Sequence, residues 1–298
     1  MAENWSTQKE RSNPFTLRLI CGFARTMPRW ITRLWLWPIT LYFFLLAPKA
    51  RAASRHYLKR VPGQRGSLVE VFRHLHSFAS VILDRVYFLT DKFDKFRIET
   101  HDAEVLTQAL AKGHGVIVLG AHVGSFEAMR CLGIRHAHLP LKIMMYHDHN
   151  AMITRVLDEL NPEVARSVIN LADHNALLHA KEALEDGAVI GMLGDRVLPD
   201  EKKITCTLLG APVEMPEGPI TLALLLGVPV IVFFGIYAGA NRYIVSHDLL
   251  YPGEKRVRGE REAVLKEVTQ RYVALIEDKL RQYPYNWFNF YDYWGDDL

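Results

Sequence analysis

The sequence contains few cysteines, and they form no arrangement that marks a known site. Its 298 residues include only Cys21, Cys131 and Cys206, which are too widely scattered for a disulfide framework or a CxxC pair. This sparse use of cysteine fits a reducing compartment, so we expect the body of the protein on the cytoplasmic side of a membrane. Internal repeats and low-complexity linkers are also missing, which fits one large domain or two modest ones.

Several motifs of catalysis and nucleotide binding are absent as well. The sequence has no Gly-x-Ser-x-Gly elbow, no P-loop and no Gly-x-Gly-x-x-Gly after an expected strand. These absences weaken the case for a serine hydrolase and remove support for nucleotide use. His147 and His149 share one face if they lie in a strand, but no further ligands at standard spacing accompany them. We therefore expect neither a metal nor a cofactor.

The net charge is small over the whole chain but uneven along it. Lys and Arg number 36 and Asp and Glu number 33, which gives +3. Residues 1–60 carry 11 basic and 2 acidic residues, or +9, so the remaining 238 residues carry −6. This asymmetry indicates an anionic partner for the N-terminal segment, either a membrane or a nucleic acid.

An apolar run of 14 residues, Leu34–Ala47, lies within this basic segment. It is shorter than the roughly 20 apolar residues of a full membrane span. Aromatic residues suited to the membrane–water boundary lie within it, and basic residues flank it: Trp35, Trp37, Tyr42, Arg33, Lys49, Arg51 and Arg55. We expect a membrane-inserted or interfacial anchor whose basic flanks meet anionic headgroups, with Arg33 able to snorkel. The alternative is a hydrophobic helix docked on the body. Nucleic acid is disfavoured, because Leu, Trp and Phe interleave with the basic residues and no recognised module surrounds them.

The rest of the chain has an α/β pattern. We expect residues 1–63 to form the anchor region and residues 64–298 an α/β domain, which opens with a helix capped by Ser67 and Glu70. The expected strands are 116–119, 141–146, 164–169, 189–193 and 228–236, and the expected helices are 150–160, 173–186, 220–226 and 260–282. Continuous apolar strands that alternate with helices predict a mainly parallel central sheet flanked by helices.

The first of these strands leads into a candidate catalytic pair, His122 and Glu127. Ligands of open α/β sheets gather at the carboxyl ends of the strands. Gly124 permits a tight turn there, Ser125 is a natural helix N-cap, and Glu127 follows in the first helical turn. An imidazole oriented by a carboxylate is a good general base toward a hydroxyl. The alternative is a histidine bonded to backbone, with Glu127 merely favouring the helix dipole.

The His-x4-Glu spacing in this strand–turn–helix context resembles the signature of the glycerolipid and lipid A acyltransferase superfamily. Residues 184–196 resemble the family's second region, with an Asp-containing loop at Asp195, and residues 209–223 resemble a later region. The ending Pro284-Tyr-Asn-Trp287 resembles the closing motif of the lauroyl/myristoyl branch of the lipid A late acyltransferases. The resemblance covers most of the chain. Glu217 looks like part of a motif of the phospholipid branch, but its position favours a structural role.

This resemblance implies a membrane-associated O-acyltransferase at the cytoplasmic face of a bacterial-type inner membrane. His122, oriented by Glu127, would deprotonate a hydroxyl of a lipid or glycolipid acceptor, which then attacks the thioester of a fatty acyl donor. Backbone N–H groups near Gly124 are candidates for stabilising the oxyanion. Arg196 suits a phosphate or carboxylate of a substrate, with a salt bridge to Asp195 or another loop carboxylate as its alternative role. The residues expected to bind substrate are Gly124, Ser125, Asp195 and Arg196.

The C-terminus departs from the pattern of that branch, which typically ends in basic residues after its Trp. This chain has no Lys or Arg after Trp287, and its tail carries Asp292, Asp296 and Asp297. A highly phosphorylated acceptor would match it poorly, so aryl-polyene-type lipids stay open as acceptors. The donor is either acyl carrier protein, which the branch favours, or coenzyme A. Two other functions remain: a lipid hydrolase or thioesterase that uses the same pair to activate water, and a non-catalytic membrane scaffold.

Overall fold

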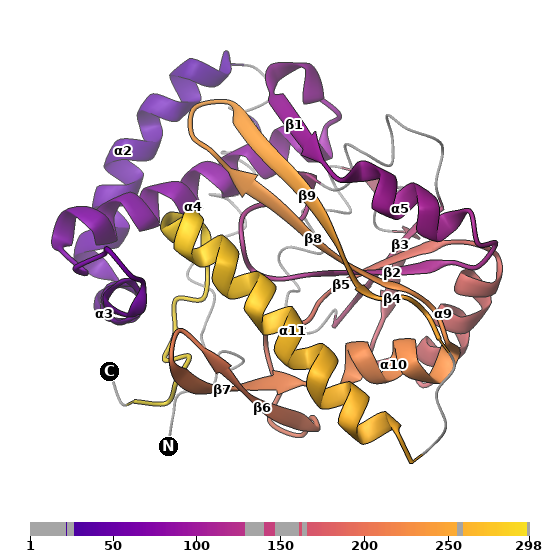
Figure 1. Ribbon diagram of the computed structural model, residues 1–298. Helices are drawn as coiled ribbons and strands as arrows, with labels where there is room; N and C mark the ends of the chain where they lie inside the picture. The colour runs from indigo at the N-terminus through magenta and orange to yellow at the C-terminus, as the bar shows by residue number, and fades with distance from the viewer. Residues whose placement is uncertain are drawn as a thin grey trace.

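A seven-stranded sheet forms the centre of the molecule (Figure 1). The computed structural model describes residues 22, 27–128, 140–146, 161–162, 166–254 and 259–296. The strand order is β1-β9-β8-β2-β5-β3-β4, and every neighbouring pair is parallel except β8 with β9. The strands are β1 Arg97–His101, β2 Val116–Gly120, β3 Leu141–Met145, β4 Val168–Asn170, β5 Val189–Leu193, β8 Val230–Tyr237 and β9 Arg242–Tyr251. The structure thus confirms the predicted α/β fold with a mainly parallel sheet flanked by helices.

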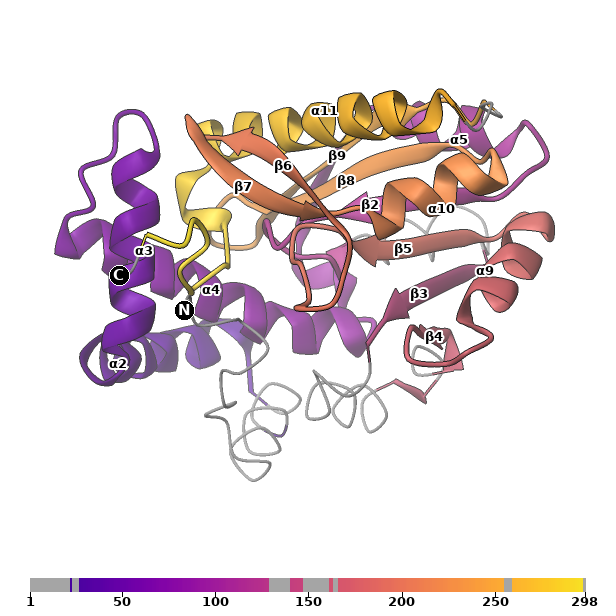
Figure 2. The same cartoon turned by 90° about the horizontal axis from the view of Figure 1, so that it is seen from below.

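Helices cover the sheet and gather at its ends. They are α2 Arg29–Leu46, α3 Pro48–Arg60, α4 Leu68–Leu89, α5 Ala103–Leu110, α9 Ala176–Glu185, α10 Gly218–Leu226 and α11 Arg261–Gln282, with 3-10 turns at Phe93–Lys95 and Pro284–Asn286. Both views place α2, α3 and α4 together at one end of the molecule and α5 and α9 at the other (Figures 1 and 2). The helix α4 starts with the predicted capping box, in which Ser67 and Glu70 bond each other's backbone N–H groups.

Some elements differ from the expectation or were not expected. The sequence patterns missed the edge strand β1 and the antiparallel strand β9. They also missed the hairpin of β6 Lys203–Leu208 with β7 Ala211–Pro216. The hairpin strands alternate exposed and buried side chains and contain several polar residues, so they lack the continuous apolar run that marks a covered strand. The predicted helix 150–160 lies outside the described residues. Of the strand predicted at 164–169, only residues 168 and 169 fall in β4; residues 166 and 167 precede this strand, and 164–165 lie outside the described residues.

The N-terminal helix α2 has an unusual distribution of side chains. Residues at a spacing of four are buried against the body, namely Thr32, Leu36 and Thr40, while most of its large apolar side chains are exposed. No single helix among the described residues is long and apolar enough to cross a membrane. Within the same described residues, α2 and α3 pass such a test together, as a pair bent by 95°. The predicted domain boundary at residue 63 falls in the turn between α3 and α4, and the division into domains stays a prediction.

Candidate active site

The ends of two neighbouring parallel strands bring His122 and Asp195 together. In the ladder between β2 and β5, Gly120 is the partner of Leu193, so the residues two positions further on also lie side by side. His122 Nδ1 lies 2.7 Å from Asp195 Oδ1, and the His122 backbone N–H donates to Asp195 Oδ2 at 2.9 Å. A histidine at a strand end is thus held by a carboxylate from the adjacent strand end.

The electrostatics of this pair favour a neutral imidazole beside an ionised carboxylate. Burial by itself would raise the pKa of the Asp195 carboxyl, but His122, Arg196 and Asn289 outweigh it and lower that pKa to about 2. Burial, assisted by the charge of Arg196, lowers the pKa of His122 below its ordinary value, against the opposing effect of Asp195. An ionised carboxylate only accepts hydrogen bonds, so Nδ1 carries the proton and Nε2 the lone pair. The His122 side chain is 25% exposed, which leaves Nε2 as the nitrogen that can meet a substrate.

Glu127, which we expected to orient His122, has other partners in the structure. Its Oε1 lies 2.6 Å from Nε of Arg85 on α4, and its Oε2 accepts from Ser125 Oγ at 3.2 Å. The carboxylate on the imidazole is that of Asp195, which we had expected only to bind substrate. The difference arises because the strand register aligns His122 with the end of β5, whereas Glu127 lies beyond the turn, where it meets α4.

The turn that contains Gly124 passes very close to strand β8. Gly124 has a φ of +71°, and a Cβ atom there would lie 2.1 Å from the carbonyl oxygen of Gly235, so only glycine fits. The Gly124 N–H donates to Asn286 O at 2.8 Å, and the Ser125 N–H donates to Gly235 O at 2.7 Å. These two N–H groups, expected as oxyanion donors or substrate contacts, therefore hold the turn in place instead.

A C-terminal segment, residues 284–293, completes the candidate site. The sequence analysis did not predict that this segment contacts His122 and Asp195. Its Phe288 N–H donates to His122 O at 2.7 Å. Asn289 is buried and donates from Nδ2 to Asp195 Oδ2 at 3.0 Å. Tyr293 OH donates to the Asp195 carbonyl at 2.8 Å. The only sequence signal was the Pro284-x-x-Trp287 motif, which gave no reason to expect its neighbour Asn289 against the carboxylate that holds His122.

The same segment fixes Arg196. The Arg196 Nε donates to Asn289 Oδ1 at 2.8 Å and its Nη2 donates to Phe288 O at 3.2 Å. The guanidinium also lies over the ring of Tyr291, 5.8 Å from its centroid. Backbone and amide oxygens thus orient this cation next to the His122–Asp195 pair, in place of the salt bridge with Asp195 that was its alternative role.

A second histidine, His74 of α4, ties the C-terminal segment to the N-terminal helices. Its Nδ1 lies 2.8 Å from Ser54 Oγ on α3, and its Nε2 lies 2.5 Å from the carbonyl oxygen of Trp287. The carbonyl requires a proton on Nε2, so Nδ1 accepts from the serine hydroxyl. Complete burial lowers the pKa of His74 to about 4, although the bond to Trp287 opposes this. His74 is therefore a neutral structural link behind the site.

This burial predicts that the protein loses stability in mild acid. Below pH 6.5 the unfolded chain binds a proton at His74 that the folded protein takes up only near pH 4, so the free energy of unfolding falls across that window. The difference between the ordinary pKa of 6.5 and the folded-state pKa of about 4 corresponds to a loss of about 3 kcal/mol in the free energy of unfolding by pH 4. Denaturant unfolding in detergent between pH 7 and pH 4 measures it. We expect a shallower pH dependence in His74→Gln and an unchanged one in His179→Gln, whose histidine is exposed on α9. Equal slopes in wild type and His74→Gln would contradict the prediction.

The part of the chain that the structure describes contains no cluster of potential metal ligands. Among those residues, no group of three or more His, Cys, Asp or Glu side chains could hold a metal ion. The pair His147 and His149 lies outside the described residues.

Comparison with known proteins gives one match over nearly the whole chain. The family model of the bacterial lipid A biosynthesis acyltransferases matches residues 23–295. That range includes His122, Asp195 and the C-terminal segment up to Tyr293. A search of curated individual proteins finds no match.

Proposed function

Because the chain belongs to the bacterial lipid A biosynthesis acyltransferase family and is an acyltransferase, we propose that it transfers a fatty acyl chain from an acyl thioester to a hydroxyl of a lipid or glycolipid. The observation that carries this proposal is the His122–Asp195 pair at the carboxyl ends of β2 and β5. A neutral imidazole whose Nδ1 is held by an ionised carboxylate is a general base suited to a hydroxyl.

The chemistry follows from this pair. The lone pair on His122 Nε2 accepts the proton of the acceptor hydroxyl as its oxygen attacks the thioester carbonyl. The C–S bond of the resulting tetrahedral intermediate then breaks, and the imidazolium returns its proton to the thiolate leaving group. Between these two proton transfers, the Asp195 carboxylate stabilises the His122 imidazolium. This agrees with the effect of Asp195 on the pKa of His122, which it raises. These reaction steps balance without an acyl-enzyme, a metal or a cofactor.

Two further charged residues have roles in this proposal. Glu127 holds Ser125 and is held by Arg85, so it keeps the turn after β2 in shape rather than touching the imidazole. Arg196 lies beside the pair with its orientation fixed, which suits it to a phosphate or carboxylate of a substrate. The donor is an acyl carrier protein or coenzyme A thioester, and the family branch favours the former.

The acidic residues of the C-terminal tail argued against a phosphorylated acceptor in the sequence analysis. The structure weakens that argument. Asp296 accepts a hydrogen bond from Arg60 Nη2 and lies 3.2 Å from His56 Nε2, so Arg60 of α3 partners its charge. The charge of the tail therefore does not distinguish between an acceptor of the lipid A type and an acceptor of the aryl-polyene type.

Membrane association is the other part of the proposal. Members of the family are generally membrane-associated, and the large apolar side chains of α2 are exposed. We place the protein at the cytoplasmic face of a bacterial-type inner membrane, where a lipid acceptor is at hand.

An acyl-transfer assay tests the function directly. Purified protein is incubated with acyl carrier protein thioesters or coenzyme A thioesters, with and without lipid acceptors, and the products are identified by mass spectrometry. We expect a lipid product heavier than the acceptor by one acyl group, formed only when both substrates are present. Release of free fatty acid at a rate that acceptors do not change would instead show a hydrolase. An absence of turnover with every donor and acceptor would favour a non-catalytic scaffold.

A further inference from the structure

The inner face of α2 is held to the body by polar contacts. Two threonines on this face are buried, and each bonds a side chain of α4: Thr32 Oγ1 lies 3.0 Å from Tyr87 OH, and Thr40 Oγ1 lies 3.1 Å from His76 Nδ1. Polar pairs of this kind fix the rotation of a helix about its own axis, because a turned helix would leave them buried and unpaired.

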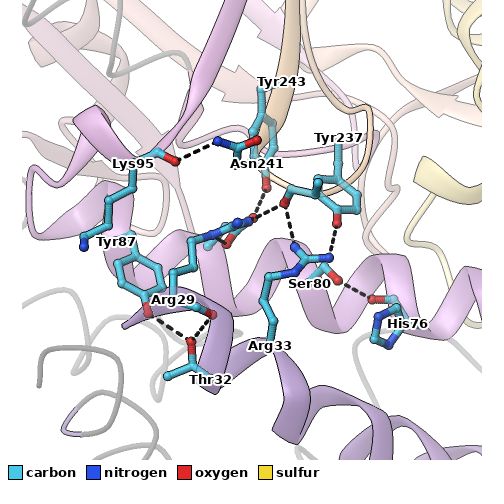
Figure 3. A network of polar contacts seen from close by, with 12 residues as sticks. Arg29, Thr32, Arg33, His76, Ser80, Tyr87, Lys95, Tyr237, Asn241 and Tyr243 are labelled. Carbon is cyan, nitrogen blue, oxygen red and sulfur yellow. Dashed lines mark hydrogen bonds and ion pairs between the residues drawn. The ribbon is translucent and has the colours of Figure 1, made fainter. Parts of the chain in front are cut away.

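Two arginines strengthen this attachment from one end of α2 (Figure 3). Arg29 forms a two-pronged ion pair with the fully buried Asp84 of α4, at 2.8 Å and 2.6 Å. Arg29 and Arg33 both donate to the carbonyl oxygen of Ala240, in the turn between β8 and β9, at 2.6 Å and 2.7 Å. Arg33 also donates to Tyr237 OH at 2.8 Å. Arg33, which we expected to reach lipid headgroups, therefore points inward.

The outer face of α2 is apolar and uncovered. Seven large side chains on it are between 49% and 66% exposed: Trp30, Leu34, Trp35, Leu41, Tyr42, Leu45 and Leu46. Trp37 lies at the edge of this face, where its ring contacts Phe72 and His76 of α4. A soluble helix has the opposite arrangement, with its apolar face inward and its polar face outward. An apolar face of this extent marks a surface that a partner covers.

The composition of this face and the charges beside it favour a lipid surface as that partner. Trp and Tyr rings prefer the headgroup level of a bilayer. Three exposed basic residues follow on α3, namely Lys49, Arg55 and Lys59, and they complement anionic headgroups. A second copy of the chain fits less well, because a two-fold contact would bring the basic segments of both copies toward each other.

We propose that α2 lies parallel to the bilayer surface, with its outer face at the depth of the headgroups and upper acyl chains, and that it does not span the membrane. This inference rests on the membrane association proposed above and specifies its geometry. The catalytic body is then attached to the bilayer rigidly, through the Arg29–Asp84 pair, rather than by a flexible tether.

The contacts on the inner face argue against a spanning orientation. A spanning α2 would have to leave α4, which removes Arg29, the cationic partner of the buried Asp84 carboxylate. It would also place Arg29 and Arg33 next to hydrocarbon instead of their oxygen partners. An in-plane helix keeps every one of these contacts and still buries its outer face.

Depth measurements along α2 distinguish the two orientations. Cysteine replaces Leu34, Leu41 or Leu45, one at a time, in a background with Cys21→Ser and Cys131→Ser that keeps the buried Cys206. Each introduced cysteine carries a fluorophore. Quenching by lipids brominated at different depths is measured in vesicles of phosphatidylethanolamine and phosphatidylglycerol. An in-plane helix gives all three labels the same shallow depth. A spanning helix separates the labels at Leu34 and Leu45 by about 16 Å along the membrane normal, since the eleven residue steps between them rise by about 1.5 Å each. A label at Leu177, exposed on α9, is the matched control and should stay unquenched.

Each outcome bears on the inference separately from the enzymatic function. Equal shallow depths for the three labels support it. Depths that increase steadily along the helix overturn it while leaving membrane association and acyl transfer intact. Labels that lipids do not quench, in a protein that sediments as a dimer, would assign the outer face of α2 to a second copy of the chain. That result would overturn the inference and the membrane part of the proposed function. The acyl-transfer assay on the same labelled proteins reports independently whether the active site is preserved.

Discussion

Replacement of His122 by alanine is expected to reduce acyl transfer by about 10²–10⁴-fold, the usual contribution of a positioned general base. The side chain is partly exposed and packs at a strand end, so its removal should leave the fold and membrane binding intact. Initial rates of product formation at saturating donor and acceptor measure the loss, and flotation with vesicles measures membrane binding.

The matched control for this variant is His179→Ala. His179 is exposed on α9, and its removal should leave the rate unchanged. Normal turnover in His122→Ala, with the control also active, would rule out the proposed base. A loss of vesicle binding together with activity would show that the substitution damages more than the chemistry.

The second large effect is expected from Asp195→Asn. The amide fills the same space but lacks the charge that stabilises the imidazolium and selects the His122 tautomer. In hydrolases with a comparable carboxylate–imidazole pair, the equivalent change lowers kcat by about 10⁴-fold, and we expect a loss between 10²-fold and that value. Asp195 raises the pKa of His122, so the acid limb of the pH–rate profile should also move to lower pH in the variant.

The Glu127→Gln variant distinguishes the His122–Asp195 pair found in the structure from the His122–Glu127 pair predicted from the sequence. This change weakens the ion pair with Arg85 but leaves the imidazole and its carboxylate in place. We expect a smaller loss than in Asp195→Asn and an acid limb at the wild-type position. If Glu127→Gln is the more damaging variant and the one that shifts the acid limb, the His122–Glu127 pair predicted from the sequence is the catalytic one in the working enzyme.

Much of the fold could be predicted, because its central strands are continuous apolar runs. The strands near residues 116–120 and 189–193 and the long helix ending at Gln282 appear where the patterns place them. The strands that escaped prediction, β1, β6, β7 and β9, mix polar and apolar residues and owe their form to pairing with a neighbouring strand. Such pairing is a tertiary contact, and local sequence patterns carry little information about it.

The candidate site was only half predictable for a related reason. His122 stands directly after an apolar strand and before a glycine turn, so its place at a strand end could be deduced. The identity of its carboxylate depends on which strands are neighbours. A spacing of five residues drew attention to Glu127, whereas the lateral register of β2 and β5 supplies Asp195, 73 positions away.

Short stretches of the sequence were enough to establish the α/β class, the likeness to lipid acyltransferases, the histidine at the end of its strand and the concentration of basic and apolar residues near the N-terminus. These are local properties, set by the order of residues over short windows. The places of Asp195 and Asn289 in the candidate site, and the inward direction of Arg29 and Arg33 from α2, became known from the folded structure alone. These contacts join segments tens to hundreds of residues apart. Their geometry is set by strand register and helix packing, which exist only once the whole chain has folded.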